Sequence, residues 1–149
     1  MLSKIHAEDI MTENVIVVPA DMPVAQVAHL LLRERVSGYP VTDKNGKILG
    51  IVTLTDFFMF LDKIAKNREQ LPEDLRGQDF AETLAKCKNC PVAQIMTSKL
   101  VAITPQTTLQ EIVEAIVKWN IHSFPVMKDG KLAGIIGRHD VLNAIFVYG

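Results

Sequence analysis

Two aspartates stand in matching contexts, each a few residues after a glycine and a short apolar run. Asp56 ends Gly50-Ile51-Val52-Thr53-Leu54-Thr55-Asp56, and Asp140 ends Gly134-Ile135-Ile136-Gly137-Arg138-His139-Asp140. The apolar runs predict buried strands, and the patterns that follow predict helices whose first turn carries the carboxylate. Thr53 and Asp56 have the spacing of a capping box, so helix capping alone explains one copy. A helix can be capped by several residue types, so capping does not require the same aspartate motif at two helices. The repetition of the motif therefore favours a function beyond capping.

Cys87 and Cys90 form the one C-x-x-C pattern in the sequence. Such a pair can be a redox couple, half of a zinc site or two structural thiols. A zinc site would need further ligands, and the four histidines are not spaced around the pair. Pro91 follows the motif, unlike the strand-to-helix turn expected for thioredoxin-type chemistry. The pattern favours structural thiols, with a metal shared across a dimer as the alternative.

Composition narrows the functional classes. The 149 residues are 48% hydrophobic, which fits one compact unit or two small halves that share a core. The net charge of −1 and the lack of a long basic run disfavour recognition of nucleic acid. No segment approaches the ~20 apolar residues of a membrane span, so we expect a cytoplasmic protein. Paired carboxylates, a nucleophile motif and a glycine-rich phosphate loop are all missing from the sequence, which disfavours an enzyme.

The elements that would position the aspartates also occur twice. Each copy predicts a short strand, an amphipathic helix, a strand that starts with an aromatic residue and proline, a tight hairpin, a third strand and a last helix. The predicted strands are 15–18, 39–42 and 47–53, then 100–103, 124–127 and 131–137; the helices start near 24, 57, 109 and 141. The hairpin turns are Asn45-Gly46 and Asp129-Gly130. The last-helix apolar stripe runs to Tyr148.

This order predicts a mixed α/β (α+β) fold of two β-α-β-β-α repeats packed about a pseudo-twofold axis, because each repeat is too small to be stable alone. We place repeat 1 at 1–65, a charged insert at 66–90 with a short helix near its end, and repeat 2 at 91–149. Phe58, Met59, Leu142, Phe146 and Val147 lie off the main apolar stripes of the last helices. They predict a second contact, with the other half, with the insert or with another subunit.

Taken together, three repeated motifs give the chain a family resemblance. They are Ile-Met-Thr (10–12 and 95–97), aromatic-Pro-Val (39–41 and 124–126) and Gly-apolar-apolar-x-x-x-Asp (50–56 and 134–140). The chain resembles a tandem pair of CBS domains, also called a Bateman module. The resemblance implies two clefts between the repeats that bind AMP, ADP, ATP or S-adenosylmethionine and report their level to a partner protein. Catalysis is not part of that pattern.

The resemblance also assigns site residues. A carboxylate without a cation partner can accept hydrogen bonds from both ribose hydroxyls, and the helix N–H groups and a threonine hydroxyl lie near a phosphate. The implied first cleft consists of Thr53, Asp56, Val101, Ala102, Ile103, His122 and Pro125. The implied second cleft consists of Thr12, Ile16, Val17, Ser37, Gly38, Pro40, Arg138 and Asp140. Gly137 stands where the family usually has serine or threonine, so the second cleft lacks that hydroxyl. Leu54 stands where the second copy has Arg138, so the first cleft lacks that basic side chain. Each cleft therefore has only some of the usual phosphate-binding groups.

Three functions remain open at this point. The first is a nucleotide sensor that forms a homodimer through the terminal helices of its repeats and signals to an unknown partner. The second is a structural dimerisation module with vestigial clefts, which the missing hydroxyl at Gly137 supports. The third is a metal or redox protein built on Cys87 and Cys90.

Overall fold

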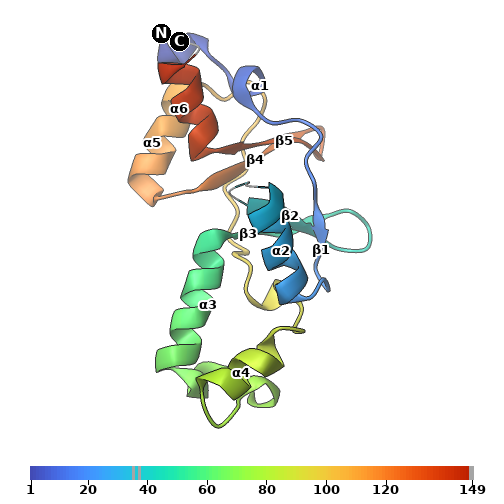
Figure 1. Ribbon diagram of the computed structural model, residues 1–149. Helices are drawn as coiled ribbons and strands as arrows, with labels where there is room; N and C mark the ends of the chain where they lie inside the picture. Colours follow the sequence, from blue (N-terminus) through green and yellow to red (C-terminus); the bar gives the residue numbers. More distant parts are fainter. Residues whose placement is uncertain (35, 37, 148–149) are drawn as a thin grey trace. The chain divides into compact units, whose positions relative to one another are not determined.

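The computed structural model describes every residue except 35, 37, 148 and 149, together with the side chain of residue 68. The predicted site residue Ser37 and the predicted helical residue Tyr148 therefore lie outside the described residues. The chain forms two compact units (Figure 1). Unit 1 combines Met1–Ile16 with Lys99–Gly149, and unit 2 is Val17–Ser98. The N-terminal residues thus fold with the second half of the sequence.

Unit 2 contains a mixed three-stranded sheet. In this sheet β2 pairs in parallel with β1 and antiparallel with β3. Buried residues of the sheet, of helices α2 and α3 and of the insert form one hydrophobic core, which includes Val27, Tyr39 and Ile64. The bounds are β1 Val18–Pro19, α2 Val24–Glu34, β2 Gly38–Thr42, β3 Ile48–Thr53 and α3 Leu54–Lys66.

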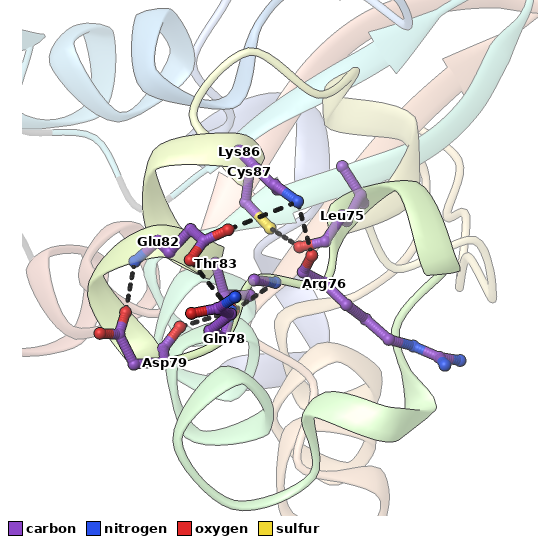
Figure 2. Close-up of polar contacts among 9 residues, drawn as sticks. Leu75, Arg76, Gln78, Asp79, Glu82, Thr83, Lys86 and Cys87 are labelled. Carbon is purple, nitrogen blue, oxygen red and sulfur yellow. Dashed lines mark hydrogen bonds and ion pairs between the residues drawn. The ribbon is translucent and has the colours of Figure 1, made fainter.

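The insert of unit 2 is an ordered substructure. It comprises the 3-10 turns η2 Arg68–Gln70 and η3 Glu73–Leu75 and then α4 Phe80–Cys87; the 3-10 turn η4 Val92–Gln94 follows it at the start of repeat 2. Polar contacts fold the loop before α4 onto the helix. Lys86 Nζ donates to the Arg76 carbonyl at 2.8 Å (Figure 2), and the Gly77 N–H donates to Thr83 Oγ1 at 2.9 Å. Leu71, Leu75 and Cys87 join the unit 2 core, so the insert is part of this unit.

Unit 1 is built around the antiparallel β4–β5 hairpin (Figure 1). Its buried core includes Ala7, Leu109, Phe124 and Ile136, contributed by α1, α5, β4 and β5. The bounds are η1 Leu2–Lys4, α1 Ala7–Ile10, α5 Leu109–Trp119, β4 Ser123–Lys128, β5 Lys131–Gly137 and α6 Arg138–Phe146. The mixed α/β class and the second and third strands of both repeats are confirmed.

The predicted first strands at 15–18 and 100–103 are largely wrong. Val18 with Pro19 pairs with β2, whereas 15–17 form no strand; in the second copy Ile103 makes an isolated parallel bridge to Val126. The chain passes from one unit to the other at 16–17 and again at 98–99. β-Propensity favours an extended backbone but does not determine which residues of an apolar segment pair with another strand.

The predicted turn at Asp129-Gly130 is confirmed by backbone conformation, whereas at Asn45-Gly46 only the glycine adopts the predicted positive φ. Gly46, Asp129 and Gly130 all have positive φ, at 80°, 53° and 76°. Glycine and aspartate tolerate this region better than other residues, and a pair of positive-φ residues matches the twist of the flanking strands. Each turn delivers its third strand, β3 or β5, into the helix start that carries the aspartate.

Candidate functional site

Asp56 lies in the first turn of α3 and is 7% exposed. Its Oδ2 accepts hydrogen bonds from the main-chain N–H of Thr53 at 2.7 Å and from the Thr53 hydroxyl at 3.2 Å. Its Oδ1 accepts a hydrogen bond from the Thr97 hydroxyl at 2.7 Å. The carboxylate therefore caps the helix, as the Thr53–Asp56 spacing predicts, and also holds a residue from far along the chain.

Asp140 occupies the matching place at the start of α6 but has fewer partners. Its Oδ2 accepts the main-chain N–H of Gly137 at 2.7 Å. Gly137 has no hydroxyl to offer, and among the described residues no hydrogen bond reaches Oδ1 of Asp140. The side chain is half-buried. Asp140 is thus the more open of the two acceptors.

The repeated glycine of each motif creates room for the Ile-Met-Thr segments, 10–12 and 95–97. Thr97 exchanges two main-chain hydrogen bonds with Ile51, and Thr12 does the same with Ile135. A Cβ on Gly50 would lie 2.6 Å from the Thr97 carbonyl oxygen, and one on Gly134 would lie 2.8 Å from that of Thr12. Close backbone approach therefore requires glycine at both positions, and it brings a threonine beside the strand that precedes each aspartate-bearing helix.

Neither aspartate forms an ion pair with a residue that the structure describes. Arg138 and Leu54, which occupy matching positions after β5 and β3, are both exposed. No cation of the described residues therefore competes with a ligand's hydroxyl donors for either carboxylate. Arg138 places a positive charge near Asp140 that could bind a phosphate group. Leu54, at the matching position near Asp56, carries no charge.

The remaining predicted residues divide between the units. In unit 1, Ile103 donates its N–H to the Pro125 carbonyl at 3.0 Å, and His122 lies half-buried just before β4. In unit 2, Gly38 pairs with Thr53 and Pro40 with Ile51 across β2 and β3. Val101 is half-buried, while Ala102, Ile16 and Val17 are exposed. Each predicted residue set draws on both units, so the composition of a complete cleft stays a prediction.

Sequence reasoning missed Thr97 as a partner of Asp56. The signal was present, because the Ile-Met-Thr motif recurs and Thr12 was already assigned to the site of Asp140. If the threonine of each Ile-Met-Thr motif is assigned to the aspartate of the other half of the sequence, Thr97 is placed beside Asp56 just as Thr12 is placed beside Asp140.

The two cysteines are buried free thiols. Burial and the nearby Asp74 raise the pKa of Cys87; burial and the Cys87 thiol raise the pKa of Cys90 to about 11. A protonated, buried thiol is a poor nucleophile and a poor metal ligand. Among the described residues, no group of three or more His, Cys, Asp or Glu side chains is placed to hold a metal ion. These features favour the structural interpretation of the motif.

Comparison with known proteins identifies the family. The CBS domain family matches residues 7–63 and 92–147, which together make up most of the chain. The chain belongs to the CBS domain family. Its two matched regions coincide with the two sequence repeats, and the predicted tandem arrangement is therefore confirmed.

Three relatives show the range of proteins that this chain resembles. The uncharacterized protein MJ1426 of Methanocaldococcus jannaschii is 31% identical, over 93% of this chain and 89% of that protein. The crystal structure of CBSX2 in complex with AMP has a TM-score of 0.69 and 25% identity, covering 94% of this chain and 95% of that one. The SNF1-related protein kinase regulatory subunit gamma-1 of Arabidopsis thaliana is 29% identical over 95% of this chain.

The extent of these matches differs. The chain spans 34% of the kinase regulatory subunit and 61% of CBSX2 from Arabidopsis thaliana. The region similar to this chain thus makes up most of MJ1426 and only part of the two longer relatives. In the part of the chain that the structure describes, no helix is both long enough and apolar enough to cross a membrane.

Proposed function

We propose that this CBS pair is a regulatory module that binds an adenosine ligand, AMP, ADP, ATP or S-adenosylmethionine, through Asp56 and Asp140 and signals its level to a partner protein. The observation that supports this most directly is the pair of carboxylates, each in the first turn of a helix and free of ion pairs with described residues. A relative that aligns over nearly the whole chain has been crystallised with AMP. The module itself carries out no reaction, and the cytoplasm is its proposed location.

The chemistry follows from the donors and acceptors. A ribose presents two neighbouring hydroxyl donors, and a carboxylate is a charged acceptor with two oxygens, so their hydrogen bonds are stronger than neutral ones. The first N–H groups of α3 and α6 favour a nearby anion such as phosphate. Arg138 beside Asp140 adds a guanidinium, the side chain best suited to phosphate. A ligand with more phosphate groups should therefore depend more on the Asp140 group.

Thermal stability tests the ligand class. A ligand that binds only the native state stabilises it, by about 2.7 kcal/mol at a concentration near 100 Kd. We expect at least one of AMP, ADP, ATP and S-adenosylmethionine to raise the Tm. Asp56→Ala and Asp140→Ala should each reduce the increase, and the double variant should abolish it. Asp62→Ala is the matched control, because Asp62 lies on the exposed side of α3 and pairs with Lys66. If no ligand raises the Tm, or if the double variant responds like the native protein, the proposal is wrong.

A structural dimerisation module is the second candidate function. It is supported by exposed apolar side chains on the terminal helices of both repeats: Phe58 and Met59 on α3 are 68% and 66% exposed, and Phe146 on α6 is 79% exposed. Exposed clusters of large apolar residues are typical of protein interaction sites. This candidate predicts a dimer whose stability and shape are the same with and without nucleotide, which small-angle scattering with and without AMP would decide.

A further inference from the structure

The hydrogen-bond capacity of Asp56 is nearly used. A carboxylate has about four lone-pair sites. In Asp56, Oδ2 accepts two hydrogen bonds from Thr53, and Oδ1 accepts one from Thr97. A vicinal diol donates two hydrogen bonds, so it cannot bind this carboxylate without displacing one donor that is already there.

The hydrogen-bond donor on Oδ1 is the one that a ligand's diol would have to displace. Both bonds on Oδ2 come from Thr53 at the start of α3, and one of them is a main-chain bond that belongs to the helix cap. Among the described residues, Thr97 is the one that donates to Oδ1, and it comes from a different segment of unit 2. A ligand hydroxyl that approaches the less occupied oxygen therefore meets the Thr97 hydroxyl.

Asp140 provides the internal comparison. The matching threonine, Thr12, makes the same main-chain hydrogen bonds to its strand, but its hydroxyl donates to no described residue. From the residues that the structure describes, Asp140 accepts one hydrogen bond, whereas Asp56 accepts three. The backbone arrangement is shared by the two copies, whereas the occupied carboxylate is specific to Asp56.

We propose that the Thr97 hydroxyl is a built-in competitor at Asp56, which holds the carboxylate oxygen that a ligand's vicinal diol needs and must release it when the ligand binds. This inference rests on the proposed function. Release requires little movement, because the Thr97 main chain stays paired with Ile51 and the hydroxyl leaves by rotation about χ1 to another staggered position. Thr97 thereby weakens the Asp56 group for diols and makes the two carboxylates unequal.

Titration with AMP tests the competition. In an Asp140→Ala background, which leaves Asp56 as the remaining acceptor, calorimetry compares the parent with Thr97→Val and Thr97→Ser. Valine keeps the shape of threonine and lacks the hydroxyl, so we expect AMP to bind about tenfold more tightly, the gain from no longer breaking a hydrogen bond to a charged group. Thr97→Ser keeps the competitor and should bind like the parent. Ser98→Ala, which removes the neighbouring hydroxyl, should also leave the affinity unchanged.

The outcomes separate the two proposals. If AMP binds neither the native protein nor any variant, the proposed ligand class fails and the competition fails with it. If AMP binds and Thr97→Val binds it equally or more weakly, only the competition is overturned, because the hydroxyl is then neutral or contacts the ligand. With 2′,3′-dideoxy-AMP, which lacks the diol, the gain from valine should disappear; a retained gain overturns the assignment to the diol.

A measurement on the native side chain does not depend on the variants folding. Three-bond NMR couplings to the Thr97 methyl carbon report χ1. We expect one rotamer in the free protein and a different one when AMP saturates the Asp56 group. An unchanged χ1 at saturation, confirmed by shifts of the Asp56 resonances, overturns the proposal.

Discussion

At the scale of single residues, Gly50 is required for space and Gly46 for backbone conformation. A Cβ on Gly50 would meet the Thr97 carbonyl oxygen, whereas Gly46 has positive φ and open surroundings. Gly50→Ala should lower the free energy of unfolding by roughly 1–3 kcal/mol, the usual cost of overpacking. It should also speed amide exchange at Ile51 and Thr97, which bond to each other.

Gly46→Ala is the matched control for that prediction. The strain in this variant is confined to the hairpin turn, where alanine must adopt a positive φ. Gly46→Ala should therefore lower the free energy of unfolding by about 1 kcal/mol. Exchange at Ile51 and Thr97 should keep its native rate. Equal acceleration in both variants would mean that Gly50 has no special relation to the 95–97 segment.

The thiol of Cys90 gives a second prediction at this scale. Its pKa is raised from 9.0 to about 11, chiefly by burial. Since the thiolate is the reactive form, the native protein at pH 8 should react with DTNB at least ~100-fold more slowly than the chain unfolded in guanidinium. The rate should rise with pH as far as about pH 11. Fast reaction of the native protein at pH 8 would instead restore the redox interpretation of Cys87 and Cys90.

At the scale of elements, α4 depends on Thr83. This fully buried side chain accepts the Gly77 N–H and donates to the Asp79 carbonyl at 2.7 Å (Figure 2). Thr83→Val keeps the volume but leaves both main-chain groups without this partner, at a cost of roughly 1–3 kcal/mol. Thr55→Val, at an exposed position of α3, should cost less than about 0.5 kcal/mol. Chemical denaturation of both variants measures the difference; equal midpoints would contradict the role of Thr83.

The elements also show how far the sequence alone can lead. The helix start at Thr53 was accessible because capping is local, and the predicted Thr53–Asp56 contact is present. The structure adds two local caps of the same kind, the Asp79 carboxylate at α4 and Thr108 with Glu111 at α5. The first strands were not accessible, because strand pairing joins distant segments: of the predicted strands 15–18 and 100–103, Val18 pairs with β2 and Ile103 makes an isolated bridge to β4. The contact of Thr97 with Asp56 joins distant segments, and motif repetition alone pointed to it.

At the scale of the whole molecule, the N-terminal segment ties the two ends of the sequence together. Ala7 is fully buried in the core of unit 1, and the main chain of α1 bonds to Pro105 and Thr107. The compact units therefore do not follow the order of the sequence repeats. Loss of residues 1–16 would remove core packing from the unit that contains Asp140, although Asp140 lies far away in the sequence.

Self-association is the property of the whole molecule that the exposed apolar side chains predict. We expect a homodimer that uses Phe58 of α3 and Phe146 of α6, because burying such side chains in an interface contributes roughly 1.5–3 kcal/mol each. Phe58→Glu and Phe146→Glu should each weaken association by at least tenfold, and together they should give a monomer in sedimentation equilibrium.

Phe80→Glu is the matched control for that experiment, because Phe80 is a 42% exposed phenylalanine on α4, outside the terminal helices of the repeats. It introduces the same charge and should leave the dimer intact. A monomeric native protein would contradict the prediction directly. A dimer that survives both terminal-helix substitutions but dissociates with Phe80→Glu would move the interface to the insert, and the exposed faces of α3 and α6 would then be free to receive a regulated partner.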